Sequence, residues 1–475
     1  MKSAFAFLIA LLSTPWIALC AADAPRTTYP NILVLLSDDQ GYHDLGCQGS
    51  QDIPTPNIDS LAKNGVRCAS GYVTSCMCSP SRAGLLTGRS QSRFGHEINW
   101  EGNDPTGMRG LPLSEKTLAD HLKTAGYRTG CVGKWHLGDA AKFHPNRRGF
   151  DDFFGFTSGG HEYFCDKYVA AKDGVETYRT FLQRNGTPEP HTGYLTTVLG
   201  REGAAFIHRN RENPWFLYAA FNAPHTPLQA PQAYLDRFAH VTDTDRRTYA
   251  AMVGALDDAV GDILQQLRAD GLEQNTLVFF LSDNGGPLDR NSSRNTPLNG
   301  EKGNMLEGGI RVPFLVQWKG VLPGGATYDR PVSSLDIAAT ALALVGVSGT
   351  PERPLDGVNL IPYFSGAQSG DPHAALFWRM KARNIWAVRV GDWKLAASHR
   401  WHEIPAGIPL PRLINLAEDI GELNDLRALG SGKLAELQTA YDAWNAGLPE
   451  PLWGIDNSPE AVKARKQRVQ RLRAK

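Results

Sequence analysis

The stretch Asn31-Ile-Leu-Val-Leu-Leu-Ser37 is a continuous apolar run that ends in the acidic pair Asp38-Asp39. A run without polar alternation is typical of a strand that is buried on both faces of a parallel sheet. The stretch Thr276-Leu-Val-Phe-Phe-Leu-Ser282 repeats this pattern and ends in Asp283-Asn284. In open parallel sheets, ligands bind at the carboxyl ends of the strands. The two runs therefore predict a parallel sheet with a polar site at that edge.

Helical segments alternate with further strands along the first three quarters of the chain. Thr55 followed by Pro56 predicts the start of a helix, and Gly65 predicts its end. The alternation is typical of a doubly wound α/β sheet with helices on both faces. Other helices are expected near 116–125, 247–269 and 334–345, and other strands at 128–132, 215–220 and 312–318.

The last quarter of the chain has a different pattern. Beyond the Gly- and Pro-rich stretch 346–357, two strand segments at 375–378 and 386–395 predict an antiparallel sheet. A helix is expected at 433–446, and one stripe of it is predicted to pack on the small sheet: Leu434, Leu437, Tyr441 and Trp444. We predict a signal peptide over 1–22, an α/β domain over 23–350, and a C-terminal subdomain with an antiparallel sheet and a helix over 351–475.

The N-terminus carries the features of an export signal. Lys2 precedes an apolar stretch over 4–12, and the small residues Ala21-Ala22 predict cleavage near that point. The stretch falls short of the roughly 20 apolar residues of a membrane-spanning helix. We therefore expect a secreted or periplasmic protein without a transmembrane segment. A lipoprotein modified at Cys20 is the less favoured alternative, because the bulky Leu19 precedes that cysteine.

Charge and cysteine content exclude several classes of protein. Lys plus Arg and Asp plus Glu both number 49, so the chain lacks the broad positive charge that nucleic-acid binding needs. With 42% hydrophobic and 21% charged residues, the composition is that of a folded globular protein. The cysteines beyond the signal do not indicate a dense disulfide framework, although one or two bridges are compatible with them: Cys47, Cys68, Cys76, Cys78, Cys131 and Cys165.

The polar residues after the two apolar strands are candidate metal ligands. Asp38, Asp39 and Asp283 offer carboxylate oxygens, and Asn284 offers an amide oxygen. Such oxygen donors suit a hard divalent cation, so calcium or magnesium is implied. Either pair alone is equally compatible with the capping of a following helix. The presence of two such pairs favours a metal site.

The stretch Cys78-Ser79-Pro80-Ser81-Arg82 opens a predicted helix that ends at Gly88. Ser79 is the expected N-cap, and Pro80 is the expected first helical residue. The helix dipole and Arg82 favour an anion at this end, so Cys78 is a candidate reactive thiolate. The alternative is a buried, inert cysteine, which is the commoner fate of this residue type.

This region resembles the maturation signal of the type I sulfatases. That signal reads Cys-x-Pro-Ser-Arg followed by Leu-Thr-Gly-Arg, and here Cys78 to Arg82 and Leu86 to Arg89 match it. The resemblance implies a large domain of the alkaline phosphatase type, with a mostly parallel sheet flanked by helices, and a smaller subdomain with an antiparallel sheet. It extends through Gly133-Lys-Trp-His-Leu-Gly138, Ala223-Pro-His-Thr-Pro227, Gly300-Glu-Lys-Gly303, Glu307-Gly-Gly-Ile-Arg-Val-Pro313, Gly391-Asp-Trp-Lys-Leu395 and Leu416-Ala-Glu-Asp419.

The resemblance implies hydrolysis of sulfate esters with one bound calcium ion. A maturation enzyme of the host is expected to oxidise Cys78 to formylglycine, whose hydrated gem-diol attacks sulfur and forms a sulfo-enzyme intermediate. The implied metal ligands are Asp38, Asp39, residue 78, Asp283 and Asn284. The implied catalytic residues are Cys78, Arg82, Lys134, His136, His225 and Lys302.

Family position also implies roles for these residues. His136 is the expected base, and Lys134 is expected to hold the sulfate and the diol. His225 and Lys302 are expected to assist the departing alkoxide, and the sequence leaves open which of them donates the proton. His161 and Glu162 lie in a loop where members of this family build substrate subsites.

Two other functions compete with a sulfatase that acts on a sulfated small molecule or glycan. One is a phosphatase or phosphonate monoester hydrolase of the same superfamily, because phosphoryl and sulfuryl groups need similar clamps. The other is a non-catalytic relative that binds sulfated glycans. The intact cysteine signal and the complete set of basic residues favour the sulfatase. The sequence does not define the sugar position, exo or endo attack, or the oligomeric state.

Overall fold

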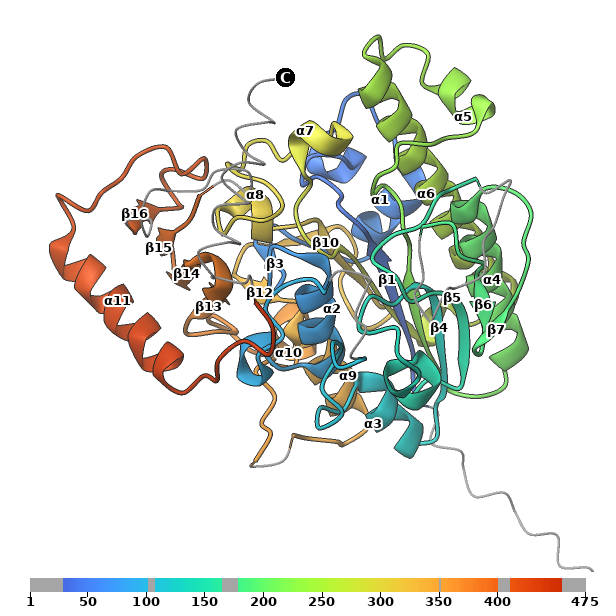
Figure 1. Cartoon of the computed structure of the whole chain (residues 1–475), viewed down its shortest axis with the longest axis horizontal. Helices are drawn as coiled ribbons and strands as arrows, with labels where there is room; N and C mark the ends of the chain where they lie inside the picture. The colour runs from blue at the N-terminus through green and yellow to red at the C-terminus, as the bar shows by residue number, and fades with distance from the viewer. Residues whose placement is uncertain (1–28, 101–106, 165–177, 350–351, 400–410, 455–475) are drawn as a thin grey trace, which may run out of the picture.

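The computed structural model describes residues 29–100, 107–164, 178–349, 352–399 and 411–454. The expected signal peptide and Cys165 lie outside these residues. A ten-stranded, mostly parallel sheet forms the centre of the protein, and a separate four-stranded antiparallel sheet follows in the C-terminal part (Figure 1). This arrangement confirms the predicted α/β fold class. The boundary near 350 stays a prediction.

Four neighbouring parallel strands form the middle of the large sheet. They are β9 (Thr276–Ser282), β1 (Asn31–Ser37), β8 (Trp215–Ala220) and β4 (Arg128–Lys134). Every residue of β1 and β9 is buried, as their unbroken apolar runs predicted. The register pairs the last residues of β1 and β9, so the polar residues that follow both strands emerge side by side.

The edges of the large sheet contain shorter strands, some of them antiparallel. The strand expected at 312–318 is reduced to Phe314–Gln317, because Pro313 has no N–H to donate to a neighbouring strand. This strand, β10, runs antiparallel to β9. The other strands are β2 (Val66–Cys68), β11 (Ala326–Tyr328), β5 (Asp152–Phe156), β6 (Gln183–Arg184) and β7 (Thr187–Pro188), while β3 (Gly71–Tyr72) pairs with β12 (Val332–Ser333) in a small ladder.

Helices cover both faces of the large sheet, as predicted. Alternate residues of β1 enter two separate cores, with Val34 in one and Leu35 in the other. The first core is covered by α2 (Cys78–Thr87), α3 (Leu118–Thr124) and α9 (Leu335–Leu344). The second is covered by α1 (Pro56–Lys63), α4 (Leu195–Asn210) and α6 (Thr244–Ala269). Shorter helices are α5 (Gln232–Arg237), α7 (Leu288–Asn291), α8 (Glu307–Ile310) and α10 (Ile361–Phe364).

The start of α2 differs from the prediction. Met77 occupies the N-cap, and Cys78 is already the first helical residue. Ser79 does not cap the helix, because its hydroxyl lies 2.7 Å from His96 Nε2. The helix ends at Gly88, whose φ of 65° is the left-handed conformation predicted for this glycine. Cys78 therefore lies at a helix N-terminus, as predicted, but inside the first turn.

The small sheet packs between a helix and the large domain. Its strands are β13 (Leu376–Met380), β14 (Ile385–Val390), β15 (Trp393–Ala397) and β16 (Arg412–Asn415), and α11 (Ser431–Ala446) covers one face. The rings of Trp386 and Tyr441 stack at 4.1 Å between centroids. This confirms the predicted packing of the α11 stripe. The opposite face meets the large domain through Trp378 and Tyr72, among others.

The described cysteines form no disulfide among themselves: Cys47, Cys68, Cys76, Cys78 and Cys131 are free thiols. The bridges that the sequence left open are therefore not formed between these five residues. In the parts of the chain that the structure describes, no helix combines the length and the apolar character that crossing a bilayer requires.

Candidate active site

The predicted site residues meet at the carboxyl ends of the four central strands. The last residue of β4 and the residues that follow β1, β4, β8 and β9 supply seven side chains, α2 supplies two and the loop before α8 supplies one. All of these side chains are buried or nearly so, and Lys302, at 14%, has the largest exposed fraction given for them. They are Asp38, Asp39, Lys134, His136, His225, Asp283, Asn284, Cys78, Arg82 and Lys302.

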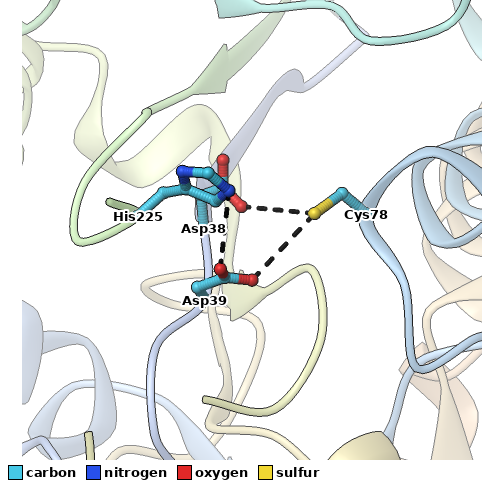
Figure 2. A group of neighbouring side chains, drawn as sticks. All are labelled: Asp38, Asp39, Cys78 and His225. Carbon is cyan, nitrogen blue, oxygen red and sulfur yellow. Dashed lines mark hydrogen bonds and ion pairs between the residues drawn. The ribbon is translucent and has the colours of Figure 1, made fainter. Parts of the chain in front are cut away.

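Cys78 points from α2 toward the acidic pair after β1 (Figure 2). Its Sγ lies 3.6 Å from Asp38 Oδ1 and 4.0 Å from Asp39 Oδ1, and Lys302 Nζ approaches it at 3.1 Å. Burial, together with the charge of Asp283, raises the pKa of the Cys78 thiol to about 12. Burial and the carboxylates therefore oppose the reactive thiolate that the helix position favours, and they outweigh the charges of Lys134 and Lys302.

Four residues form a compact group of metal-ligating type. One ligand atom from each of Asp38, Asp39, Cys78 and His225 lies within 4.8 Å of the others (Figure 2). His225 was expected as a catalytic residue and not as a ligand. The structure brings it into this group, since His225 Nε2 lies 3.6 Å from Asp39 Oδ2.

Asp283 and Asn284 lie beside this group but have other partners. Asp283 Oδ2 accepts hydrogen bonds from Arg82 Nε at 2.9 Å and Nη2 at 2.7 Å. Its Oδ1 accepts a longer bond of 3.3 Å from the Asp39 N–H. Asn284 Nδ2 donates to Asp39 Oδ1 at 2.7 Å. Its Oδ1 is buried and has no hydrogen-bond partner among the residues that the structure describes.

These donors fit a hard divalent cation. Burial and the charge of Asp38 raise the pKa of Asp283, so the packed carboxylates repel one another. Burial would also raise the pKa of Asp39, but the charges of Lys302, His225 and Lys134 lower it overall. The unpaired Asn284 oxygen is a ready ligand, and oxygen donors are those that calcium and magnesium prefer.

Three buried cations face the three carboxylates. Lys134 Nζ lies 2.5 Å from Asp38 Oδ2, and Lys302 Nζ lies 2.6 Å from Asp39 Oδ1. Arg82 bonds Asp283 and also donates to the Lys134 carbonyl at 3.0 Å. Formal charges are thus balanced before any ion enters. A divalent cation would give the site a positive surplus, which suits an anionic substrate in a low-dielectric pocket.

His136 is held in a strained conformation next to these charges. Its φ of 56° is in the left-handed region, as is the φ of 62° at Asp39. Its N–H donates to the Thr157 carbonyl at 3.2 Å. A Cβ on Gly159 would lie 2.9 Å from His136 Nε2, so that glycine leaves room for the ring. Burial and the charge of Lys134 hold the pKa of His136 well below its usual value, which leaves a neutral proton acceptor.

His225 is also neutral in this arrangement. Its Nδ1 lies 2.6 Å from the Thr226 carbonyl, so Nδ1 carries the proton and Nε2 is left to face Asp39. Burial lowers the pKa of His225 to about 3 despite the nearby carboxylate. Burial would lower the pKa of Lys302 as well, but Asp39 raises it well above its usual value. Lys302 is therefore the protonated member of the pair.

The side chains of His161 and Glu162 contact other residues of their own loop region and not the cluster around Cys78. His161 is fully buried, and its ring nitrogens lie 2.7 Å from the Glu162 and Thr180 carbonyls. Glu162 Oε1 pairs with Arg179 at 2.7 Å. Tyr178, which sequence reasoning missed, is 41% exposed, and its ring centroid lies 6.3 Å from that of His225. A lone aromatic residue in a loop gives no sequence signal for such a place.

We expect the protein to lose stability as the pH falls below neutrality. Burial lowers the pKa of His96 to about 3, against about 6.5 in an unfolded chain. The stability from the neutral ring is complete above about pH 6.5, and it is lost as the pH falls toward the folded value. Thermal unfolding should give a Tm lower by about 3 °C at pH 4.5 than at pH 7.5 from this group alone.

His96→Gln isolates this effect. The variant should show a smaller change in Tm between the two pH values than the wild type, whereas the exposed His240→Gln should behave like the wild type. Equal pH dependence in His96→Gln and the wild type would contradict the assignment to His96.

The fold and the site together define a hydrolase of the alkaline phosphatase superfamily. The sequence profile of the family described as Sulfatase matches residues 30–347. N-acetylgalactosamine-6-sulfatase of Mus musculus is 35% identical over 411 residues, which span 82% of this chain and 75% of that protein. The chain belongs to the sulfatase family, and it is a sulfuric ester hydrolase.

Solved structures agree with this assignment. The crystal structure of Ps i-CgsB in complex with k-i-k-neocarrahexaose matches with a TM-score of 0.83 and 35% identity, over 93% of this chain and 98% of that chain. The phosphonate monoester hydrolase of Agrobacterium radiobacter matches with a TM-score of 0.62 and 20% identity, over 88% and 95% of the two chains. The second likeness shows a shared fold alone.

Proposed function

We propose that this sulfatase removes sulfate from sulfated carbohydrates, with formylglycine at position 78 and one calcium ion. The proposal depends on one observation. The buried Cys78 side chain contacts Asp38, Asp39 and Lys302 at the carboxyl ends of the central strands. The names of two similar proteins support a carbohydrate substrate. One is an N-acetylgalactosamine-6-sulfatase, and the structure of the other was solved with k-i-k-neocarrahexaose.

Asp38, Asp39, Asp283 and Asn284 would hold the calcium ion together with residue 78. When bound, the ion and the hydrated aldehyde supply an oxygen nucleophile of lowered pKa. The remaining side chains bind and move charge around it. Lys134 and Arg82 are buried cations that would orient the sulfate group and offset its charge.

Lys302 and His136 take complementary roles in this proposal. Lys302 Nζ is protonated and lies 3.1 Å from the Sγ of residue 78, so it would stabilise negative charge on the leaving oxygen. His136 is neutral and buried, so its imidazole would accept a proton from a hydroxyl at residue 78. We also propose that His225, beside Asp39, assists the departing alkoxide, for which its Nε2 would first have to take up a proton.

We propose that the sugar contacts the partly exposed ring of Tyr178. The catalytic side chains are buried, whereas this ring is half-exposed beside His225. An aromatic side chain with an apolar face and a polar hydroxyl suits a sugar ring, which presents both kinds of surface. We also propose export with removal of residues 1–22, and maturation by a formylglycine-generating enzyme or its equivalent.

Comparative rates on matched esters test the reaction. We expect kcat/KM for 4-nitrophenyl sulfate to exceed that for 4-nitrophenyl phosphate by at least about 100-fold, because the site is expected to hold one calcium-type ion and not a metal pair. A reversed ratio would favour the phosphatase or phosphonate hydrolase.

A screen of defined sulfated saccharides tests the substrate. Free sulfate should be released from at least one of them by protein that carries the aldehyde. Tight saccharide binding without sulfate release, in protein confirmed to be modified, would identify a non-catalytic binding protein instead.

A further inference from the structure

The loop that carries Lys302 contacts the C-terminal sheet through a buried group of charges. We call this group the Lys394 cluster: Lys394, Glu307, Glu422, Arg311 and Arg389. Lys394 Nζ lies 2.8 Å from Glu307 Oε1 and 2.9 Å from Glu422 Oε1, and all three side chains are fully buried. Arg311 Nη1 adds a contact of 3.3 Å to Glu307 Oε2. Burial would raise the pKa of Glu307, but the charges of Lys394, Arg311 and Arg389 lower it to about 2.

The small sheet is arranged to present cations to the large domain. Lys394 on β15 lies directly opposite Arg389 on β14, a pairing of like charges that is unfavourable by itself. Their neighbours on the same face, Ala387 and Ala396, pack on the large domain, while Leu395 faces α11. Both cations therefore point away from α11 and toward Glu307 and Tyr72.

Buried ion pairs are poor stabilisers, because desolvation offsets their attraction and apolar residues could fill the same volume. The main effect of the Lys394 cluster is therefore to restrain the position of α8. Glu307 starts α8, and its N–H donates to Glu422 Oε2 at 2.6 Å. The nearby Met305 N–H donates to Ser398 Oγ, at the end of the small sheet, at 2.8 Å. The C-terminal part thus holds both the side chain and the backbone of Glu307 at the start of α8.

The same stretch of backbone leads directly to Lys302. The Gly308 N–H donates to the Asn299 carbonyl at 2.6 Å, so α8 and the start of the loop are tied together. The Gly303 N–H donates to the Cys76 carbonyl at 2.9 Å, next to the segment that carries residue 78. The Lys302 side chain then reaches Asp39 and Cys78. A shift of α8 would therefore be transmitted to Lys302.

We propose that Lys394 is a positioning residue for sulfate ester hydrolysis. Its hydrogen bond to Glu307 and its ion pair with Glu422 lock α8 and so place the Lys302 ammonium beside residue 78. The proposal rests on the proposed role of Lys302 at the leaving oxygen. It gives the C-terminal sheet a part in building the catalytic site.

A double-mutant cycle with two aryl sulfates tests the proposal. Lys394→Met should lower kcat for phenyl sulfate, a poor leaving group, by about 30-fold, and for 4-nitrophenyl sulfate by only about 3-fold, with KM nearly unchanged. In a Lys302→Ala background, the same change should cost less than about 2-fold. Equal decreases in kcat for both esters, or full additivity of the two substitutions, would overturn the proposed positioning role of Lys394. Lys433→Met, on the solvent-facing side of α11, removes an exposed Lys–Glu pair with Glu436 and should change turnover of neither ester.

Hydrogen exchange gives a second readout that needs no turnover. Lys394→Met should speed exchange of the Met305, Glu307 and Gly308 amides by about 10-fold or more, and Lys433→Met should not. Unchanged exchange in Lys394→Met would also overturn the proposal. If the wild type cleaves no sulfate ester, the proposed function is wrong. The exchange result would still show whether Lys394 holds α8 in place. If Lys394→Met does not fold, Glu422→Gln replaces one carboxyl group of the cluster with little change of shape and takes its place in both experiments.

Discussion

Cys78→Ala is expected to abolish sulfate release, with kcat at least about 10⁴-fold below that of the wild type. The variant removes the side chain from which the proposed nucleophile is made, and no other described cysteine approaches the acidic cluster. The fold should persist, because the thiol contributes only polar contacts with Asp38, Asp39 and Lys302. Steady-state sulfate release and a thermal melt measure the two expectations.

Cys68→Ala is the matched control for this change. Cys68 is equally buried but lies in β2, within the apolar core, so its loss should lower stability slightly and leave kcat unchanged. Mass analysis of the peptide that contains residue 78 completes the experiment. An unmodified thiol in fully active protein, or near wild-type activity of Cys78→Ala, would reject formylglycine as the nucleophile.

Asp39→Asn is expected to lower kcat/KM by about 100-fold or more, because the loss of a proposed calcium ligand would remove several kcal/mol of charge stabilisation. Asp39 is the carboxylate with the most site partners, since it contacts Lys302, Asn284 and His225. Calorimetric titration of the metal-free protein should show calcium binding in the wild type and much weaker binding in the variant. Chelation of the wild type should reproduce the loss of activity, and added calcium should restore it.

The metal-free protein should nevertheless remain folded. Lys134, Lys302 and Arg82 already pair with the three carboxylates, so removal of the ion does not leave buried charges unpaired. Asp289→Asn, an exposed change on α7, should affect neither calcium binding nor turnover. Full calcium affinity in Asp39→Asn would place the ion elsewhere.

The sequence predicted those helices and strands whose bounds depend on neighbouring residues alone. The strands β1 and β9 have the expected bounds, because each apolar run is interrupted by polar residues at the points where the chain leaves the sheet. The helix α4 was not predicted. Gly200 and Gly203 weaken its helical pattern, yet they allow close contact with Ala259 and Ile263 of α6. That requirement is set by tertiary packing, which a local pattern does not contain.

The site could be predicted in composition but not in its electrostatics. Strand ends and family motifs identified side chains that the structure brings together. The protonation states depend on burial, and burial opposes the thiolate that the helix position of Cys78 favours. The contact of Lys394 with Glu307 joins two motifs far apart in the sequence, so neither motif alone indicated the other. Long-range pairing of this kind is visible only once the chain is folded.

The near-complete burial of Cys78, at 1% exposure, has a consequence for the order of events during synthesis. An enzyme that oxidises this residue needs the surrounding peptide in its own active site. In the folded protein that peptide is the first turn of α2, covered by the strand ends and by the loop with Lys302. Under the proposed maturation of Cys78, oxidation and folding would therefore compete in time, and a molecule that folds first would remain inactive. The yield of active enzyme should depend on how long the segment around Cys78 remains unfolded after synthesis.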